Sequence, residues 1–539
     1  MRTLTRFVAI GSLLVATPAF ASSALERIDR AFVDGRLDAP TRAIYGLRAY
    51  KAPERLPAEF RPAAGETRPR CATPVFRHAW LERDAFSPEQ AAEYASFVAR
   101  PSLASTSFAV NNAIVVHYGG TTTQLFADQV AAFADSAFNI EFTTMGFLPP
   151  LADDANGTTV NNPGPDTDLY LQTGLAYAYT ATESTNGATA WDDATAYSVL
   201  DPALPNIETY VAHELHHTSQ YAYDSKEADV LYEATAVYVE DEVFGASNDY
   251  AAFVADFQAH PERNLSFATY DDSYMYGAGI WLRWLTDKHS AGNANAVRAI
   301  WENSKQNTGT NSKNFFQALD ADVLPGLGIA NVQAMVQEFA GYRWLSGANS
   351  DGWDAESAVW PVAPSIAQFT LTNVAAGNAT TTPPQPLGVN YVVVDAAGGV
   401  AGDKLTFTLH GAPGVSWGVT KIEIPATGSA QVTPSAIDSG DGVVTIDSVD
   451  TNNLSKIVFA VTNLGTAGQA PDQLDGTSQH TGPVTPTAFT YDLAYVKENG
   501  TGCKCDVAHA PARGLPALAG LVVVAMLLLR RAASRRTAR

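Results

Sequence analysis

The chain has 539 residues, of which 46% are hydrophobic, and its 56 acidic and 34 basic side chains give a net charge of −22. This length suits two or three domains with sizeable cores, and the acidic balance, with no basic patch, argues against nucleic acid as a partner. Only three cysteines are present, Cys71, Cys503 and Cys505, which excludes a disulfide framework. We expect Cys71 to be buried and free, and we expect no catalytic cysteine.

The first 21 residues have the pattern of a secretory signal peptide. Arg2 and Arg6 precede an apolar run over residues 7–15, and Ala19 and Ala21 form a small-x-small cleavage site. The sequence therefore predicts that the protein leaves the cytosol.

Residues 22–106 contain amphipathic helical segments interrupted by prolines. Leu25, Ile28 and Phe32 are spaced to share one helix face. This N-terminal helical region is either a propeptide that keeps an enzyme inactive until secretion or an extension that packs permanently on the next domain. The sequence leaves both alternatives open.

An α/β pattern follows in the segment 107–350, which we expect to form one domain. Buried strands are predicted over residues 113–118, 168–171 and 196–200, and a helix over residues 124–138. The loop 153–168 is rich in Asp, Asn, Gly and Pro. It is predicted to be a plain surface loop, because it lacks the spacing of an EF-hand calcium site. Helices that continue to Trp344 complete a C-terminal lobe.

A helix is also predicted around Val211. Asn206 is a candidate N-cap, and Ile207, Val211 and Leu215 form an apolar stripe at helical spacing. One side of this helix would therefore face the core and the opposite side a cleft.

The polar side of that helix carries the motif HExxH, formed by His213, Glu214 and His217. Two histidines four residues apart project from one helix face and can reach one metal ion, and the glutamate can act as a general base beside it. His216 is left over, with either a supporting or a solvated role. The alternative is a surface helix that happens to be rich in histidine.

A catalytic zinc site needs a third protein ligand and an open position. Glu233 follows His217 after fifteen intervening residues, in a predicted helix over residues 231–242. This stretch resembles the second active-site helix of the aminopeptidase-type gluzincin metallopeptidases, whose pattern is W-L-x-E-G-x-A-x-Y-x-E, although Ala234 replaces its Gly and the interval is shorter. The resemblance implies that Glu233 is the third zinc ligand. Glu240, seven residues later, is the second candidate or a partner that orients a histidine.

A third motif begins at Tyr274 and is similar to the Y-x-x-G-A helix start of the same metallopeptidases. The resemblance implies that Tyr274 donates a hydrogen bond to the oxyanion of the reaction, with Tyr276 as the second candidate. The alternative is a strip of aromatic core residues.

Residues 365–497 change to short alternating apolar runs separated by Gly, Asp and Asn turns. Strands are predicted over residues 391–394, 404–409, 421–424, 443–446 and 456–461. Several closely spaced strands predict an antiparallel β-sandwich, a spacer or binding module in a secreted enzyme.

Residues 501–539 combine a short motif containing Cys503, an apolar run over residues 514–529 and a cluster of arginines from Arg530. This tail resembles the MYXO-CTERM sorting tails of myxobacteria, which implies cleavage and surface anchoring near Cys503. A plain C-terminal membrane anchor is the alternative. In either case the body of the protein would face outward, at the bacterial outer surface.

Together these patterns predict an α+β protein with a zincin-like domain followed by a β-sandwich. The predicted function is a secreted, surface-anchored zinc metallopeptidase in which His213, His217 and Glu233 bind Zn²⁺. Glu214 would act as general base and Tyr274 would stabilise the oxyanion. Endopeptidase action on polypeptides is slightly preferred, because no aminopeptidase GxMEN loop precedes the motif. The alternatives are an inactive metal-binding adhesion protein and a zinc hydrolase of a non-peptide substrate.

Overall fold

The computed structural model describes residues 23–66, 69–109, 114–151, 167–270, 273–305, 313–437, 440–446, 449–450, 453–470 and 485–497. The predicted signal peptide, almost all of the loop 153–168 and the tail 501–539 lie outside these ranges. The chain divides into two units, Met1–Val496 and Lys497–Arg539, and the following concerns the first. Within the described ranges, no helix combines the length and apolar character needed to cross a membrane.

Four α-helices form the N-terminal region: α1 (Ala24–Val33), α2 (Ala39–Lys51), α3 (Thr73–Glu82) and α4 (Pro88–Phe97). The side chains of Ser23, Asp38 and Ser87 accept backbone N–H groups at the starts of α1, α2 and α4. The predicted inward face of α1 is confirmed for Leu25 and Ile28, which are buried. These helices share one hydrophobic core with tyrosines of the following sheet.

A five-stranded mixed sheet follows, in the order β1-β2-β3-β5-β4. Its strands are β1 (Ser105–Phe108), β2 (Ile114–Tyr118), β3 (Thr167–Leu171), β4 (Ala178–Thr185) and β5 (Ala194–Leu200). The pairs β2–β3 and β3–β5 are parallel, whereas β1–β2 and β4–β5 are antiparallel. The strand predictions for β2, β3 and β5 are confirmed. β4, at the edge of the sheet, was not predicted.

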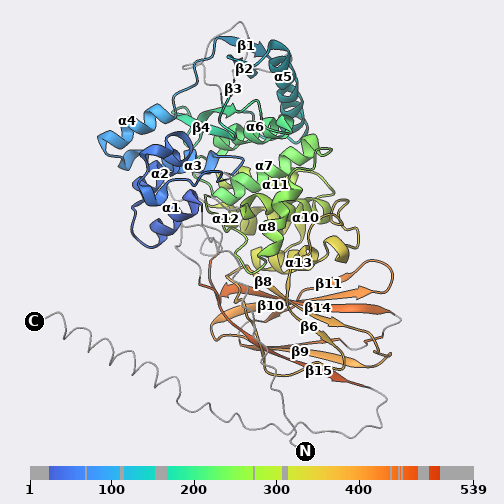
Figure 1. Cartoon of the computed structure of the whole chain (residues 1–539). Coiled ribbons are helices and arrows are strands. Elements are labelled where there is room, and N and C mark those ends of the chain that lie inside the picture. Colours follow the sequence, from blue (N-terminus) through green and yellow to red (C-terminus); the bar gives the residue numbers. More distant parts are fainter. Residues whose placement is uncertain are drawn as a thin grey trace, which may run out of the picture. The chain divides into compact units, whose positions relative to one another are not determined.

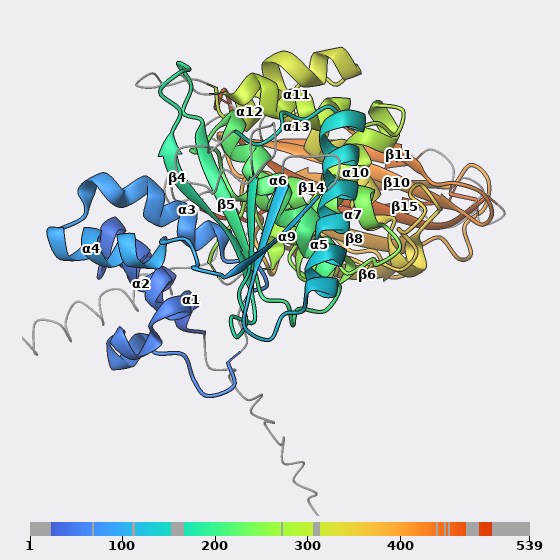
Figure 2. The same ribbon diagram turned by 90° about the horizontal axis from the view of Figure 1, so that it is seen from above.

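The two faces of this sheet pack against different helices (Figures 1 and 2). Leu169 and Leu171 of β3 join the core of α5 (Gln124–Phe138) and α6 (Ile207–Tyr223). Tyr170, between them in sequence, faces the N-terminal helices, as alternation along a strand requires. The predicted bounds of α5 are confirmed.

The start of α6 differs from the prediction. Asn206 precedes the helix, but its backbone is left-handed (φ 50°) and its side chain makes no cap hydrogen bond. Its carbonyl instead accepts from the backbone N–H and the hydroxyl of Thr209. The predicted apolar stripe is confirmed, because Ile207, Val211 and Leu215 are buried against α5 and the sheet.

Helices then build the next lobe: α7 (Asp229–Phe244), α8 (Ala251–Ala259), α9 (Tyr274–Gly277), α10 (Gly279–His289), α11 (Asn295–Ser304), α12 (Phe315–Ala318) and α13 (Val332–Trp344). The prediction of a helix over residues 231–242 is confirmed by α7. The side chain of Asn331 caps α13 by accepting the N–H of Ala334.

The remaining strands form two stacked sheets: β6 (Ser365–Thr370), β7 (Asn378–Ala379), β8 (Val389–Asp395), β9 (Lys404–His410), β10 (Val415–Pro425), β11 (Gln431–Thr433), β12 (Ala436–Ile437), β13 (Asp441–Ile446), β14 (Leu454–Thr466) and β15 (Thr490–Val496). One sheet has the order β11-β10-β14-β8-β6, with β12 beside β10, and the other has the order β13-β9-β15-β7. The predicted sandwich is confirmed with one correction: β6 pairs with β8 in parallel.

The six-stranded sheet of the sandwich is covered on both faces. Val392 and Val394 of β8 join the core between the two sheets, whereas Tyr391 and Val393 join the core of the helical lobe. The Tyr391 hydroxyl donates to the carbonyl of Ala340 in α13 at 2.8 Å. Figure 1 shows α13 next to the sheet that contains β8. Both faces of β8 are buried, so every residue from 391 to 394 faces a core, and the segment is an uninterrupted apolar run.

Candidate metal centre

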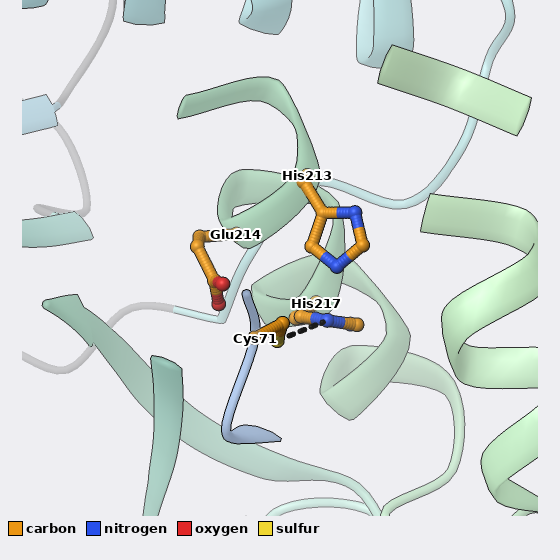
Figure 3. A group of neighbouring side chains, drawn as sticks. All are labelled: Cys71, His213, Glu214 and His217. Atoms are coloured by element: carbon orange, nitrogen blue, oxygen red, sulfur yellow. Dashed lines mark hydrogen bonds between the residues drawn. The ribbon is translucent and has the colours of Figure 1, made fainter. Parts of the chain in front are cut away.

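Helix α6 presents both histidines of the HExxH motif on one side. The rings of His213 and His217 are 4.7 Å apart between centroids, as expected for side chains one helical turn apart. Both side chains are fully buried. Figure 3 shows the two imidazoles with Glu214 and Cys71 close to them.

Helix α7 brings Glu233 to the same point. Its Oε2 lies 3.1 Å from His213 Nε2, and its Oε1 lies 3.5 Å from His217 Nε2. Burial acts to raise the pKa of Glu233, but His217 and His213 outweigh it and lower this pKa to about 2. Burial likewise acts to lower the pKa of His213, but hydrogen bonds to Glu233 and Glu240 raise it to about 10. The carboxylates therefore create a field that favours a cation at the imidazoles.

The other ring nitrogen of each histidine has a fixed partner. His213 Nδ1 lies 3.0 Å from Glu240 Oε2, and His217 Nδ1 lies 2.6 Å from Gln220 Oε1. Partners of this kind orient metal-binding imidazoles and leave Nε2 facing the ion. Glu240, the second candidate for third ligand, thus contacts His213 on the nitrogen opposite the one that faces Glu233.

Glu214 lies beside this group on the side of β4. Its Oε2 accepts hydrogen bonds from the hydroxyls of Thr180 at 2.7 Å and Thr73 at 3.2 Å. Its Oε1 is buried and, among the described residues, has no hydrogen-bond partner. One carboxylate oxygen is therefore fixed by the protein while the other is free to accept a proton.

Cys71 is the member of the site that the sequence did not place there. As predicted, it is buried and free, but its Sγ lies 3.6 Å from His217 Nε2. One ligand atom each from Cys71, His213, Glu214 and His217 lies within 4.8 Å of the others. Glu233 is outside that group of four, but it contacts both imidazoles directly. The sequence signal was that Cys71 is the sole cysteine before the C-terminal tail.

The two tyrosines of the third motif point to different places. The Tyr274 hydroxyl donates to the carbonyl of Arg263 at 3.3 Å, and its ring packs on Phe257. Tyr276 has its ring centroid 6.2 Å from that of His213, and its hydroxyl donates to the carbonyl of Cys71 at 3.3 Å. The structure thus brings Tyr276, the second candidate, to the histidines.

His216 points away from the pair formed by His213 and His217. Its Nδ1 lies 3.2 Å from Glu141 Oε2, and Phe147 packs edge-on against its ring. Burial lowers the pKa of His216 well below its usual value and raises that of Glu141 well above, so the two form a neutral pair. The predicted solvated role for His216 is wrong, because the side chain is fully buried.

The donor set suits a metal ion. Imidazole, thiolate and carboxylate are the groups that bind zinc in proteins. Glu214 Oε1 and Glu233 Oε1 are buried without a hydrogen-bond partner among the described residues, and such atoms are costly unless a cation or water satisfies them. The buried cluster can therefore hold a metal ion.

No family profile matches the chain, and no curated protein matches it. A solved structure described as CorA, a surface-associated copper-binding protein important in copper acquisition by Methylomicrobium album BG8, aligns with 24% of this chain and 98% of its own at 10% identity. The TM-score is 0.17, which is too low to support an argument about fold or function.

Proposed function

We propose that the protein is a secreted, surface-anchored zinc metallopeptidase of the gluzincin type. The observation that supports this most directly is the meeting of His213 Nε2, His217 Nε2 and the Glu233 carboxylate. Two histidines from one helix and a glutamate from the next form the ligand set of that class, and Glu214 lies beside them as the class requires.

In this proposal His213, His217 and Glu233 bind the ion. Zinc held there would polarise a carbonyl group and lower the pKa of a water molecule. Glu214 takes the proton of the attacking water on its free Oε1 and passes it to the leaving amine. Thr180 fixes the other oxygen of Glu214, so the carboxylate keeps its orientation during both transfers.

The oxyanion donor in this proposal is Tyr276. Its ring lies against His213, and its hydroxyl already donates to a peptide carbonyl, that of Cys71. A donor in such a position would stabilise negative charge that develops on a carbonyl oxygen. The Tyr274 hydroxyl instead donates a hydrogen bond to the carbonyl of Arg263.

Strand β4 is the proposed substrate strand. It lies at the sheet edge, and Thr180 of β4 contacts Glu214. An extended peptide can add to such an edge by main-chain hydrogen bonds, which would place its backbone beside the general base. This mode of binding needs no free peptide terminus and fits endopeptidase action.

The test compares metal content and peptide hydrolysis in Glu214→Gln, His213→Ala and Glu233→Ala. We expect Glu214→Gln to keep bound zinc and lose hydrolysis of an unfolded polypeptide, while the two ligand variants lose zinc. Glu59→Gln, on an exposed side chain, is the matched control. The hydrolysis assays are run with and without Cys71→Ala, because Cys71 lies at the site. Zinc content is measured in the same two backgrounds, and full zinc content in Glu233→Ala/Cys71→Ala would rule out the ligand assignment.

A second candidate is a metal-binding surface protein without catalysis. The four side chains His213, Glu214, His217 and Glu233 are 0% exposed, and closed sites with four protein ligands are characteristic of structural zinc. In that case no variant hydrolyses peptides, and removal of zinc lowers the melting temperature of the parent protein.

A further inference from the structure

We propose that residues 70–73, here called the latch segment, form a built-in inhibitor of this metal centre, with the Cys71 thiolate as its fourth protein ligand. The inference rests on the proposed function, since it describes the regulation of the same site. The Cys71 thiol lies beside His217, the Thr73 hydroxyl contacts Glu214, and the backbone of the segment pairs with β4.

The thiol lies where a ligand to the ion would lie. Cys71 Sγ is 3.6 Å from His217 Nε2 and within 4.8 Å of donor atoms of His213 and Glu214. A thiolate binds zinc strongly, and with His213, His217 and Glu233 it would complete four protein ligands. No position would then remain for the water that catalysis needs. The thiol proton goes to solvent when the bond to the metal forms, so no oxidant or reductant is involved.

The hydroxyl engages the proposed general base. Thr73 Oγ1 donates to Glu214 Oε2 at 3.2 Å and accepts the backbone N–H of Thr180 at 2.8 Å. All three residues are buried. Thr73 therefore bridges the substrate strand β4 and Glu214, in the space that a substrate backbone would enter.

The backbone of the latch segment pairs with the start of β4. Cys71 and Ala178 form a parallel bridge, in which Ala72 N–H donates to the Ala178 carbonyl at 2.8 Å and Ala178 N–H donates to the Arg70 carbonyl at 3.0 Å. A strand edge accepts one extended chain on its open side. A peptide substrate and the latch segment therefore exclude each other at Ala178.

Arg70 anchors the latch segment in the interior. Its guanidinium is paired with Glu240 at 3.1 Å and Asp249 at 3.0 Å and lies over the ring of Tyr210. Glu240 also contacts His213 Nδ1. The Glu240 carboxylate therefore contacts both Arg70 of the latch segment and the proposed metal ligand His213. This shared contact stabilises the latch segment at the metal centre.

The ligand role is tested by replacing zinc with Co²⁺, whose bond to a thiolate gives a strong near-ultraviolet charge-transfer absorption. We expect one Co²⁺ per chain and this band in the parent protein, and bound Co²⁺ without the band in Cys71→Ala. The variant Cys503→Ala/Cys505→Ala removes the other two thiols and should keep the band. Cys71→Ser, nearly isosteric, repeats the test if Cys71→Ala does not fold.

The inhibitory role is tested by zinc-dependent hydrolysis of an unfolded polypeptide. We expect Cys71→Ala to exceed the parent in kcat/KM by about tenfold or more, since a shift of ~1.4 kcal/mol toward the open site suffices for that factor. Adding Glu214→Gln should abolish the gain.

The outcomes separate the two proposals. A parent protein that binds Co²⁺ without the thiolate band overturns the ligand role of Cys71 and leaves the peptidase proposal intact. A band in the parent with equal hydrolysis by parent and Cys71→Ala overturns the inhibitory role alone. Bound metal with no hydrolysis in any variant overturns the peptidase proposal and with it the latch.

Discussion

Gln220 determines which nitrogen of His217 is available to a metal ion. Its Nε2 donates to the Tyr232 carbonyl at 2.8 Å and to the Thr235 hydroxyl at 2.6 Å. The amide orientation is thereby fixed, and Oε1 faces His217 Nδ1 as an acceptor. Nδ1 therefore carries a proton, and Nε2 is the nitrogen that faces Glu233 and Cys71 and can bind an ion.

Replacing this amide should weaken metal binding without removing a ligand. We expect Gln220→Leu to lower zinc affinity by about 10–100-fold, the usual effect of losing an orienting partner. Competition with a chromogenic chelator measures the affinity. Gln368→Leu, on an exposed strand position, is the control, and equal affinities in the two variants would contradict the assigned role of Gln220.

At the residue scale, the sequence was informative wherever the partners are close in the chain. His213 and His217 share a helix, and Glu233 follows on the next helix, so their meeting could be predicted. Cys71 could not be placed, because it reaches His217 through a single bridge between distant segments. The choice between Tyr274 and Tyr276 depends on the rotation of α9, a single-turn helix whose orientation local sequence does not determine.

At the scale of elements, α5 was predictable to its ends and β4 was not. α5 has a Thr123 cap and a regular apolar stripe. β4 has the sequence AYTATEST, with threonines instead of a run of large apolar residues. Thr180 and Thr182 are nevertheless buried, because one side of β4 faces the polar metal centre. β4 was therefore hard to predict from its sequence, because its inward-facing side chains are polar threonines and not large apolar residues.

The close approach of α8 and α9 positions Tyr276. A Cβ on Gly277 would lie 2.3 Å from the Phe253 carbonyl oxygen and 2.7 Å from Phe257 Cβ, so only glycine permits this contact between backbones. The requirement explains the glycine in the Y-x-x-G-A motif in steric terms.

We therefore expect Gly277→Ala to destabilise the fold by about 1–3 kcal/mol through overpacking. Chemical denaturation monitored by circular dichroism measures the loss. Gly326→Ala is the matched control, because a Cβ there meets nothing within 4 Å. Equal stability of the two variants would contradict the close approach of α8 and α9.

At the scale of the molecule, a buried ion pair joins the N-terminal helices to the helical lobe. Arg77 of α3 is fully buried and its Nε donates to Asp229 Oδ1 of α7 at 2.9 Å. Burial acts to raise the pKa of Asp229, but Arg77 and His78 outweigh it and lower this pKa. The N-terminal region is thus part of the packed interior as well as a neighbour of the metal centre.

Asp229→Asn should cost about 3–5 kcal/mol at neutral pH, because it leaves the Arg77 charge buried and unpaired. A lowered carboxyl pKa in the folded state contributes stability above the unfolded-state pKa, and that contribution is lost as the pH falls through the folded-state pKa. The stability difference between parent and variant should therefore shrink on acidification. Urea unfolding at several pH values measures it, and a pH-independent difference would contradict the charge assignment.

The double burial of the six-stranded sheet limits what the sandwich can recognise. One side of β8 packs against the helical lobe and the other against the second sheet. Any adhesive contact made by this module would consequently use the outer surface of β9 and β15 or the connecting loops. On that outer surface Thr406, Thr408 and Asp492 are partly exposed, and Val443 and Val496 are exposed beside them. A partner there would therefore meet hydroxyl, carboxylate and apolar groups together.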